Sequence, residues 1–184
     1  MYQRLAEFLG AKQAKYDVLP HTGAVTAQEQ AALTHTPGRS FAKVVVVKER
    51  DGFVLAVLPA TSLLDLDRLK GLIRHGAIRP ATVEEIGCVI PDCVPGAIPP
   101  FGALFSVPTY VDRTLVNARE ITMPAGDLAT AIRMRVAEFR RLSTACIGDF
   151  AVPEFLVAGS AGVPRARPAR RRRTKVVPWA RRSP

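Results

Sequence analysis

The 184-residue sequence is poor in cysteine, tryptophan and histidine, and it has no long uninterrupted apolar run. The three cysteines, Cys88, Cys93 and Cys146, are an odd number in a chain without a recognisable secretion signal. This favours a reducing cytoplasm over a disulfide scaffold, so we interpret all three as structural thiols. No window reaches the roughly eighteen apolar residues of a membrane span, and we expect no membrane association.

The common catalytic and cofactor signatures are also absent. There is no GxSxG nucleophile elbow, no Walker A lysine loop, no GxGxxG after a strand and no HExxH zinc motif. His21, His35 and His75 are far apart, and none lies at metal-ligand spacing from another histidine or an acid pair. We therefore expect neither a metal nor a cofactor. Of the three histidines, His21 directly follows a predicted strand and is the one candidate for a pocket.

The positive charge of the chain is concentrated in one segment. Of the formal net charge of +10, nine positive charges and no acid lie in residues 165–182, which leaves +1 for the rest. We expect one folded domain over residues 1–155 and a basic, Arg/Pro-rich disordered tail over residues 156–184. The run Arg170, Arg171, Arg172 and Arg173 in this tail could neutralise nucleic-acid phosphates, or the tail could be a solubilising extension without a specific partner.

A valine-rich hairpin is the element around which the rest is organised. Residues 41–47 and 53–59 are apolar runs on either side of Asp51 and Gly52, a dipeptide typical of tight turns. Four consecutive valines leave no polar face, so the first strand should lie inside a sheet and be covered on both sides.

Lys43 is the exception in this strand. Because side chains alternate along a strand, Lys43 shares its face with Phe41, Val45 and Val47. An ammonium group on an apolar face must reach water, meet an anion or lose its proton. Lys43 is therefore either a cation at the mouth of a pocket or a rim lysine that extends to water.

Local signals place further elements around the hairpin. Residues 2–14 have helical apolar spacing, and capping boxes at Thr26–Glu29 and Thr82–Glu85 predict two more helices. Asp65 and Asp112 are expected to cap helices. Strands are expected at residues 16–20, 104–111, 120–123 and 129–136, the last leading into a helix that ends near Leu142. Residues 95–102 hold three prolines and two glycines, which predicts a rigid, irregular loop.

Four features in this order resemble the YbaK/EbsC-type family, which includes the editing domain of bacterial prolyl-tRNA synthetases and free-standing aminoacyl-tRNA deacylases. They are an Ala-Gln-Glu-rich helix, the Phe41-Ala42-Lys43 entry into a valine strand, a GxxxP loop at Gly96–Pro100 about fifty residues later, and Ala125-Gly126 before a strand. The resemblance covers roughly residues 15–145. It implies an α+β single domain with a mixed, partly closed barrel-like sheet surrounded by helices.

The resemblance also implies a function and a site. The expected activity is that of a trans-editing deacylase, which hydrolyses the ester of a mischarged tRNA; the alternative is a non-catalytic aminoacyl-tRNA or nucleic-acid binding module with the same fold. The expected partners are aminoacyl-tRNA and a synthetase in trans. Lys43 would position the tRNA 3′ end, and Gly96 and Ala97 would donate amides to an oxyanion. The expected substrate pocket consists of His21, Val45, Ile98, Pro99, Pro100, Phe101, Gly102 and Gly126.

Overall fold

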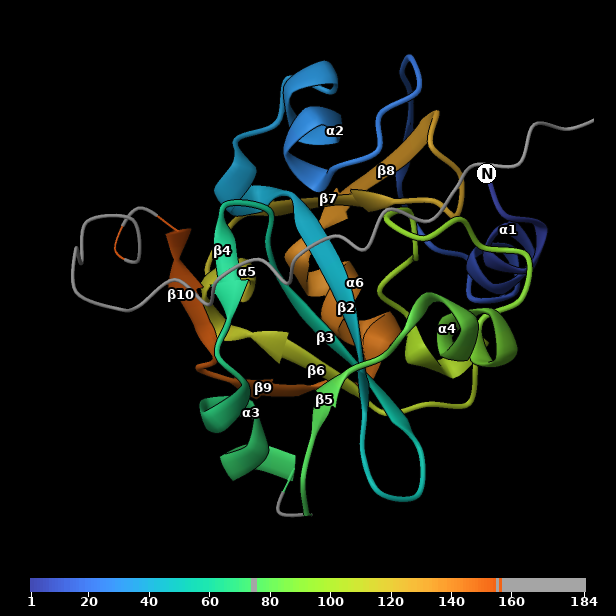
Figure 1. Cartoon of the computed structure of the whole chain (residues 1–184). Helices are drawn as coiled ribbons and strands as arrows, with labels where there is room; N and C mark the ends of the chain where they lie inside the picture. The colour runs from blue at the N-terminus through green and yellow to red at the C-terminus, as the bar shows by residue number, and fades with distance from the viewer. Residues whose placement is uncertain (74–75, 155, 157–184) are drawn as a thin grey trace, which may run out of the picture.

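The computed structural model describes residues 1–73, 76–154 and 156, in which helices surround mixed β-sheets (Figure 1). The helices are α1 (Gln3–Ala11), α2 (Ala27–Leu33), α3 (Leu66–Ile73), α4 (Val83–Val89), α5 (Arg113–Val116) and α6 (Val136–Ser143). The strands are β1 (Asp17–Pro20), β2 (Ala42–Lys48), β3 (Phe53–Pro59), β4 (Ser62–Leu64), β5 (Arg79–Pro80), β6 (Thr109–Asp112), β7 (Glu120–Pro124), β8 (Thr130–Arg135), β9 (Cys146–Gly148) and β10 (Ala151–Pro153). Residues 157–184, with the predicted tail arginines, lie outside the described residues, and the predicted boundary near residue 155 stays a prediction.

The strands form three hydrogen-bonded sheets. Their orders are β5-β2-β3-β6-β9, β1-β8-β7 and β10-β4. The pair β2–β3 is antiparallel, whereas β3–β6 and β6–β9 are parallel, so the predicted mixed α+β fold is confirmed. The predicted partial closure into one barrel-like sheet is not confirmed, because within the described residues the first two sheets are joined only by an isolated bridge between Phe41 and Thr122.

The predicted hairpin is confirmed. The turn between β2 and β3 is closed by a hydrogen bond from the Glu49 amide to the Gly52 carbonyl, 3.0 Å long. Since β2 lies between β5 and β3, it is an interior strand, as the four valines indicated. Val46 packs in the main core and Val47 in a second apolar cluster on the other face.

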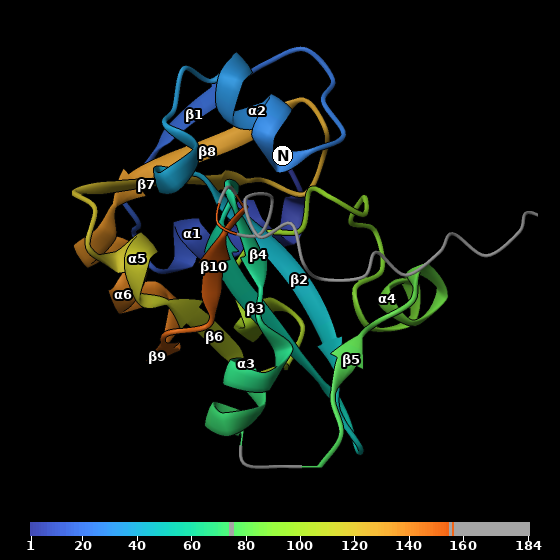
Figure 2. The ribbon, with the colours of Figure 1, turned by 60° about the vertical axis from the view of Figure 1, so that its left-hand side comes forward.

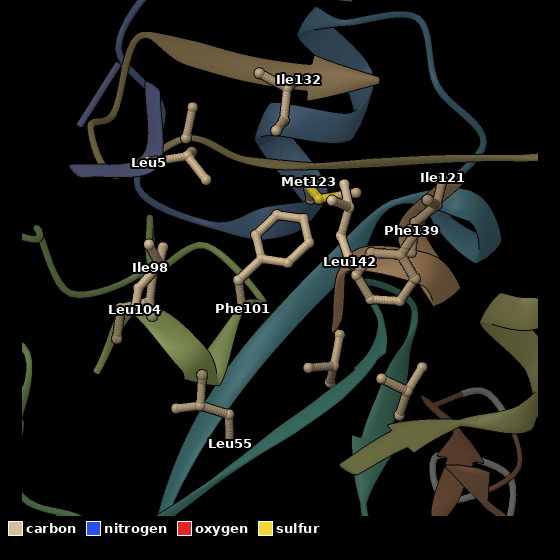
Figure 3. Close-up of a cluster of buried hydrophobic side chains, with 14 of the residues drawn as sticks. Leu5, Leu55, Ile98, Phe101, Leu104, Ile121, Met123, Ile132, Phe139 and Leu142 are labelled. Atoms are coloured by element: carbon tan, nitrogen blue, oxygen red, sulfur yellow. The ribbon is translucent and has the colours of Figure 1, made fainter. Parts of the chain in front are cut away.

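The main core lies between the sheets and α1 and α6, with Phe101 near its centre (Figure 3). The Phe101 ring lies 5.6 Å from the ring of Phe8 and 5.6 Å from that of Phe139, measured between centroids. Burying a side chain of this size contributes about 2–3 kcal/mol. The loop at residues 95–102 is therefore held in place by its own apolar side chains.

The helix starts follow the predicted caps. Both capping boxes are present: the threonine oxygen accepts from the backbone of Glu29 or Glu85, and each glutamate side chain bonds back to the cap backbone. The amide of Arg68 donates to Asp65 over 3.1 Å, which confirms the cap of α3. Within the described residues, no helix is long and apolar enough to cross a membrane.

Two features differ from the prediction. The strand expected from residue 104 begins only at Thr109, because Gly102–Leu104 forms a 3₁₀ turn and Ser106 has φ +57°. In addition, β4, β5, β9 and β10 were not predicted. Segments of two or three residues are too short to establish an alternating pattern.

Asp112 stabilises the end of the parallel strand pair. Its buried carboxylate accepts from the Thr114 amide at 3.0 Å, which confirms the predicted cap. Its other oxygen accepts from the amides of Phe150 and Ala151 at 2.8 and 2.7 Å. One carboxylate thus caps α5 and also fixes the start of β10.

Replacing Asp112 should test this double role. Asp112→Ala leaves several buried amides without an acceptor, and we expect it to lower the free energy of unfolding by about 3–5 kcal/mol. Asp65→Ala removes an ordinary cap and should cost about 0.5–2 kcal/mol. Urea denaturation of both variants measures the difference, and equal losses would contradict the anchoring of β10 by Asp112.

Candidate functional site

The exposed part of the proline-rich loop is a tight turn at Gly96. Gly96 has φ +91°, and a Cβ atom there would lie 2.7 Å from the Val25 carbonyl oxygen, so the position requires glycine. The turn is closed by a hydrogen bond of 2.9 Å from the Ala97 amide to the Val94 carbonyl. The Ala97 amide is therefore occupied, whereas the amides of Gly96 and Ile98 have no hydrogen-bond acceptor within the described residues.

The turn between β7 and β8 supports the Gly96 turn directly. The Gly126 amide donates to the Ala97 carbonyl over 2.8 Å, and the Val94 amide donates to the Gly126 carbonyl over 3.3 Å. Gly126 also has a positive φ, +98°. The structure therefore brings together Gly96, Ala97 and Gly126, three of the residues predicted for the site.

Gln30 on α2 holds the Gly96 turn from the other side. Its fully buried side-chain amide donates from Nε2 to the carbonyls of Ala24 and Gly96, each over 3.2 Å. Its Oε1 is buried without a partner in the part of the chain that the structure describes. The sequence analysis missed Gln30. A glutamine on the inner face of an alanine-rich helix was the signal that could have found it.

Lys43 is half-buried, and its Nζ lies 3.5 Å from the Ala60 carbonyl oxygen. Burial lowers the pKa of Lys43 below its ordinary value, and the nearby carboxylate of Glu154 opposes that change. The Glu154 amide donates to the Thr61 carbonyl over 3.1 Å, and its Oε2 accepts from Gln28 Nε2 over 2.8 Å. The Lys43 ammonium group and the Glu154 backbone amide thus contact two consecutive carbonyls, those of Ala60 and Thr61.

Helix α2 connects the two halves of the candidate site. Gln28 bonds to Glu154 beside Lys43, and Gln30 bonds to Gly96. Lys43 projects from the face of β2 opposite to the one that packs in the main core with the residues of the proline-rich loop. Lys43 and the Gly96 turn do not face each other across the core. They are linked through α2, whose Gln28 bonds to Glu154 and whose Gln30 bonds to Gly96.

His21 follows β1 and lies beside the start of β8. Its amide donates to the Ala129 carbonyl over 2.8 Å, and its Nδ1 lies 2.7 Å from the Thr22 carbonyl oxygen. Its Nε2 is buried and has no partner among the described residues. This ring nitrogen is the side-chain atom of His21 that has no partner among the described residues.

The other predicted pocket residues lie inside the fold. Ile98 and Phe101 belong to the main core, and Val45 packs against the second cluster. The Gly102 amide donates to Thr109 Oγ1 over 3.0 Å, and a Cβ atom at Gly102 would lie 2.1 Å from the Val107 carbonyl oxygen. Pro99 and Pro100 are also buried. Apart from Val45, which packs on the other face of β2, these residues support the Gly96 turn from within.

A cavity of about 670 Å³ lies elsewhere, between the α1–β1 connection, β8 and α6. It is bordered by charged side chains that include Lys15, Arg133 and Glu138, and by none of the predicted site residues. Arg133 is paired with Asp17 at 3.3 Å. The cavity thus has a lining of mixed charge and is separate from the candidate site.

The Cys93 thiol is half-buried. Burial, together with the neighbouring Asp92, raises the pKa of Cys93 to about 11, so this thiol is protonated at neutral pH. In the described ranges, no three or more His, Cys, Asp or Glu residues are grouped closely enough to hold a metal ion.

Comparison with known sequences gives one family and one short relative. The family model described as the aminoacyl-tRNA editing domain matches residues 21–142. The proline–tRNA ligase of Thermosipho africanus (strain TCF52B) is 34% identical over 61 residues, which are 33% of this chain and 11% of that protein. The chain therefore matches a small part of that ligase.

Comparison with solved structures shows the same fold in other proteins. The hypothetical protein APE2540 superposes with a TM-score of 0.74 at 19% identity, over 82% of this chain and 100% of the other. A proposed trans-editing enzyme for prolyl tRNA synthetase superposes with a TM-score of 0.70 at 24% identity, over 83% of this chain and 99% of the other. At these identities the likeness shows the fold alone.

The lowered pKa of Lys43 predicts an effect on stability. A group whose pKa is lowered on folding supplies stability above its unfolded pKa and loses it as the pH falls through the folded pKa. At neutral pH the charged, half-buried ammonium is therefore unfavourable, and Lys43→Met should raise the free energy of unfolding by about 0–1 kcal/mol. This gain should disappear as the pH approaches about 10.5, where lysine becomes neutral in either state.

Urea denaturation at pH 7 and pH 10 measures this effect. The control is Lys48→Met on the same strand, because Lys48 Nζ lies 4.3 Å from the Phe53 ring centroid and 3.8 Å from Glu85. We expect the control to lower stability slightly. A loss above about 1 kcal/mol in Lys43→Met would show instead that its ammonium stabilises the fold.

Proposed function

This chain belongs to the aminoacyl-tRNA editing domain family, and we propose that it is a trans-editing deacylase that hydrolyses the ester of a mischarged tRNA. The match over residues 21–142 confirms the family resemblance in the sequence. In the reaction, water adds to the ester carbonyl and the bond to the ribose oxygen breaks. The products are the free amino acid and a tRNA with its 3′-terminal hydroxyl restored.

The observation that supports this proposal best is the exposed turn at Gly96, whose amide has no acceptor among the described residues, as is also the case for the amide of the buried Ile98. The amides of Gly96 and Ile98 are the donors left for the oxyanion that forms when water attacks the carbonyl. Ala97 has a structural role in this scheme, because its amide closes the turn. Bonds from Gly126 and Gln30 hold the turn before substrate arrives, which lowers the cost of reorganisation.

Lys43 supplies the cation in the proposed mechanism. A half-buried ammonium is screened less by salt than a surface one and can pair with a phosphate near the tRNA 3′ end. Its role is to position that end. The attacking water is held by backbone groups and by the substrate's own hydroxyl, since an aminoacyl ester is already activated.

We propose the remaining pocket assignments on the same basis. His21, through its unpartnered Nε2, and Gly126 lie at the edge of the site. The buried residues Ile98, Pro99, Pro100, Phe101 and Gly102 form its supporting wall, and the partly buried Val45 lies on the same face of β2 as Lys43.

The alternative is a non-catalytic module that binds aminoacyl-tRNA or another nucleic acid. The observation that favours it is the burial of residues 97–102, which leaves Gly96 as the exposed part of the loop. Both functions require binding, so turnover distinguishes them.

A deacylation assay tests the main proposal. The wild type is incubated with tRNAs charged with alanine, cysteine, serine or proline, and loss of the ester is followed. Removing a charge-assisted contact costs about 1.5–3 kcal/mol, so Lys43→Ala should slow the best substrate about 10- to 100-fold. Lys48→Ala, on the same strand, should stay within about twofold of wild type.

The outcomes separate the three interpretations of the strand lysine. Equal rates for Lys43→Ala and wild type would identify Lys43 as a rim lysine without a functional role. Binding of charged tRNA without any hydrolysis would support the non-catalytic module. If the protein neither binds nor hydrolyses any of the charged tRNAs, both proposed functions are rejected.

We propose that aminoacyl-tRNA is captured by the basic tail and that a synthetase in trans supplies the mischarged substrate in the cytoplasm. The nine positive charges of residues 165–182 can release counterions from the phosphate backbone. Deleting the residues after Gly159 should therefore weaken tRNA binding in low salt about tenfold or more and make it less salt-dependent. Filter binding at several salt concentrations measures both effects.

The control for the tail has two parts. The unfolding midpoint of the shortened chain should equal that of the full chain, since the proposed domain ends near residue 155. Replacing only Arg170, Arg171, Arg172 and Arg173 with serine should give part of the loss in affinity. Equal affinities of the full and shortened chains would leave the tail as a solubilising extension.

A further inference from the structure

Glu154 is an acid beside the proposed site but outside the matched family segment. It follows β10, which pairs with β4 through the register Pro153 to Ser62. The two strands run alongside each other below α2 (Figure 2). The Glu154 amide donates a hydrogen bond to the Thr61 carbonyl, and the preceding carbonyl, that of Ala60, accepts from Lys43 Nζ. The fold therefore places a carboxylate near the ammonium group from a segment twelve residues beyond the family match.

The two charges are close without being a closed ion pair. Glu154 is near enough to oppose the effect of burial on the pKa of Lys43, yet none of the salt bridges in the described part of the chain joins the two groups. The Glu154 side chain is exposed, and among the described residues its hydrogen-bond donor is the neutral amide of Gln28, at 2.8 Å. Its carboxylate thus has further capacity to accept hydrogen bonds from a ligand cation.

The end of a charged tRNA has the complementary pair of charges. Its phosphates are anionic, and the esterified amino acid carries an α-amino group. Such groups have an ordinary pKa of about 7.7–8.0, so this one is largely protonated near pH 7. A cation for the phosphate and a carboxylate for the α-ammonium group therefore match the two charges of this ligand.

We propose that Glu154 binds the α-ammonium group of the aminoacyl ester and so makes the site select free aminoacyl-tRNA over N-acylated tRNA. This inference rests on the proposed deacylase function. Glu154 exchanges its contact with Gln28 for the substrate cation, and the phosphate takes the place of Glu154 as the counter-charge of Lys43. An N-acylated substrate has no cation to offer, so it would leave the carboxylate facing a phosphate without compensation.

The test compares each charged tRNA of the deacylation panel with its N-acetyl derivative. For the best substrate, we expect the wild type to hydrolyse the free aminoacyl form about 10- to 100-fold faster, as kcat/KM, than the N-acetyl form. Glu154→Gln should lose most of this preference, by slowing the free form and not the acetylated one. Glu154→Asp keeps the charge and should retain part of the preference.

Two controls separate recognition from structure. Glu49→Gln removes an acid from the β2–β3 turn, at the other end of the hairpin, and should keep the full preference. The unfolding midpoints of the Glu154 variants should match that of the wild type, because the backbone bond to Thr61 is kept. An unchanged preference in Glu154→Gln would overturn the inference, and so would equal rates of the wild type on both forms.

Failure of the proposed function has a different result. If the wild type hydrolyses neither form, the deacylase proposal fails, and the inference is then decided by filter binding of the same two tRNAs. Tighter binding of the free form by the wild type but not by Glu154→Gln would support α-ammonium recognition without turnover. Equal binding of both forms would reject it.

Discussion

The constraint on which the structure depends is that a strand buried on both faces contains a cation. The four valines of β2 fix it in the interior of its sheet, where each face must be covered by apolar side chains. Lys43 cannot be covered in this way, so its ammonium group needs polar neighbours. The chain supplies the Ala60 carbonyl, and the segment after β10 supplies Glu154. Lys43 thus has polar neighbours at a position that is otherwise unfavourable for a charge.

The Gly96 turn is held in one position by several contacts. Its position is set by main-chain bonds to the β7–β8 turn and by the buried amide of Gln30, while Phe101 holds the loop in the main core. Such a loop has little freedom to rearrange. Rigid amides at a site of developing charge are favourable for catalysis, because no reorganisation is needed when the oxyanion forms.

Much of the fold was predictable because its signals are local. Two capping boxes, the Asp51-Gly52 turn and the helical spacing near the N-terminus each lie within a few residues, and each is present in the structure. The short strands β4, β5, β9 and β10 were not predictable, since their pairing depends on segments distant in sequence. For the same reason, the sequence did not reveal that the strands form separate sheets instead of one partly closed, barrel-like sheet.

The site was predictable only in part. The sequence pointed to Gly96 and Lys43 through residue types unusual in their surroundings. It could not show that the Ala97 amide is used within the turn, because that depends on backbone geometry. Nor could it show Glu154, whose proximity to Lys43 follows from the pairing of β10 with β4, two segments distant in sequence.

The parallel pairing of β9 with β6 affects whether the matched family segment, residues 21–142, can be transferred into another protein. A fragment limited to residues 21–142 would lack β9 and leave β6 with an open row of amides and carbonyls, a common starting point for aggregation. It would also lack α1, whose Leu5 and Leu9 are fully buried, and so would uncover part of the core. Transplantation of this fold therefore requires the flanking segments, because the recognisable motif region is smaller than the cooperative folding unit.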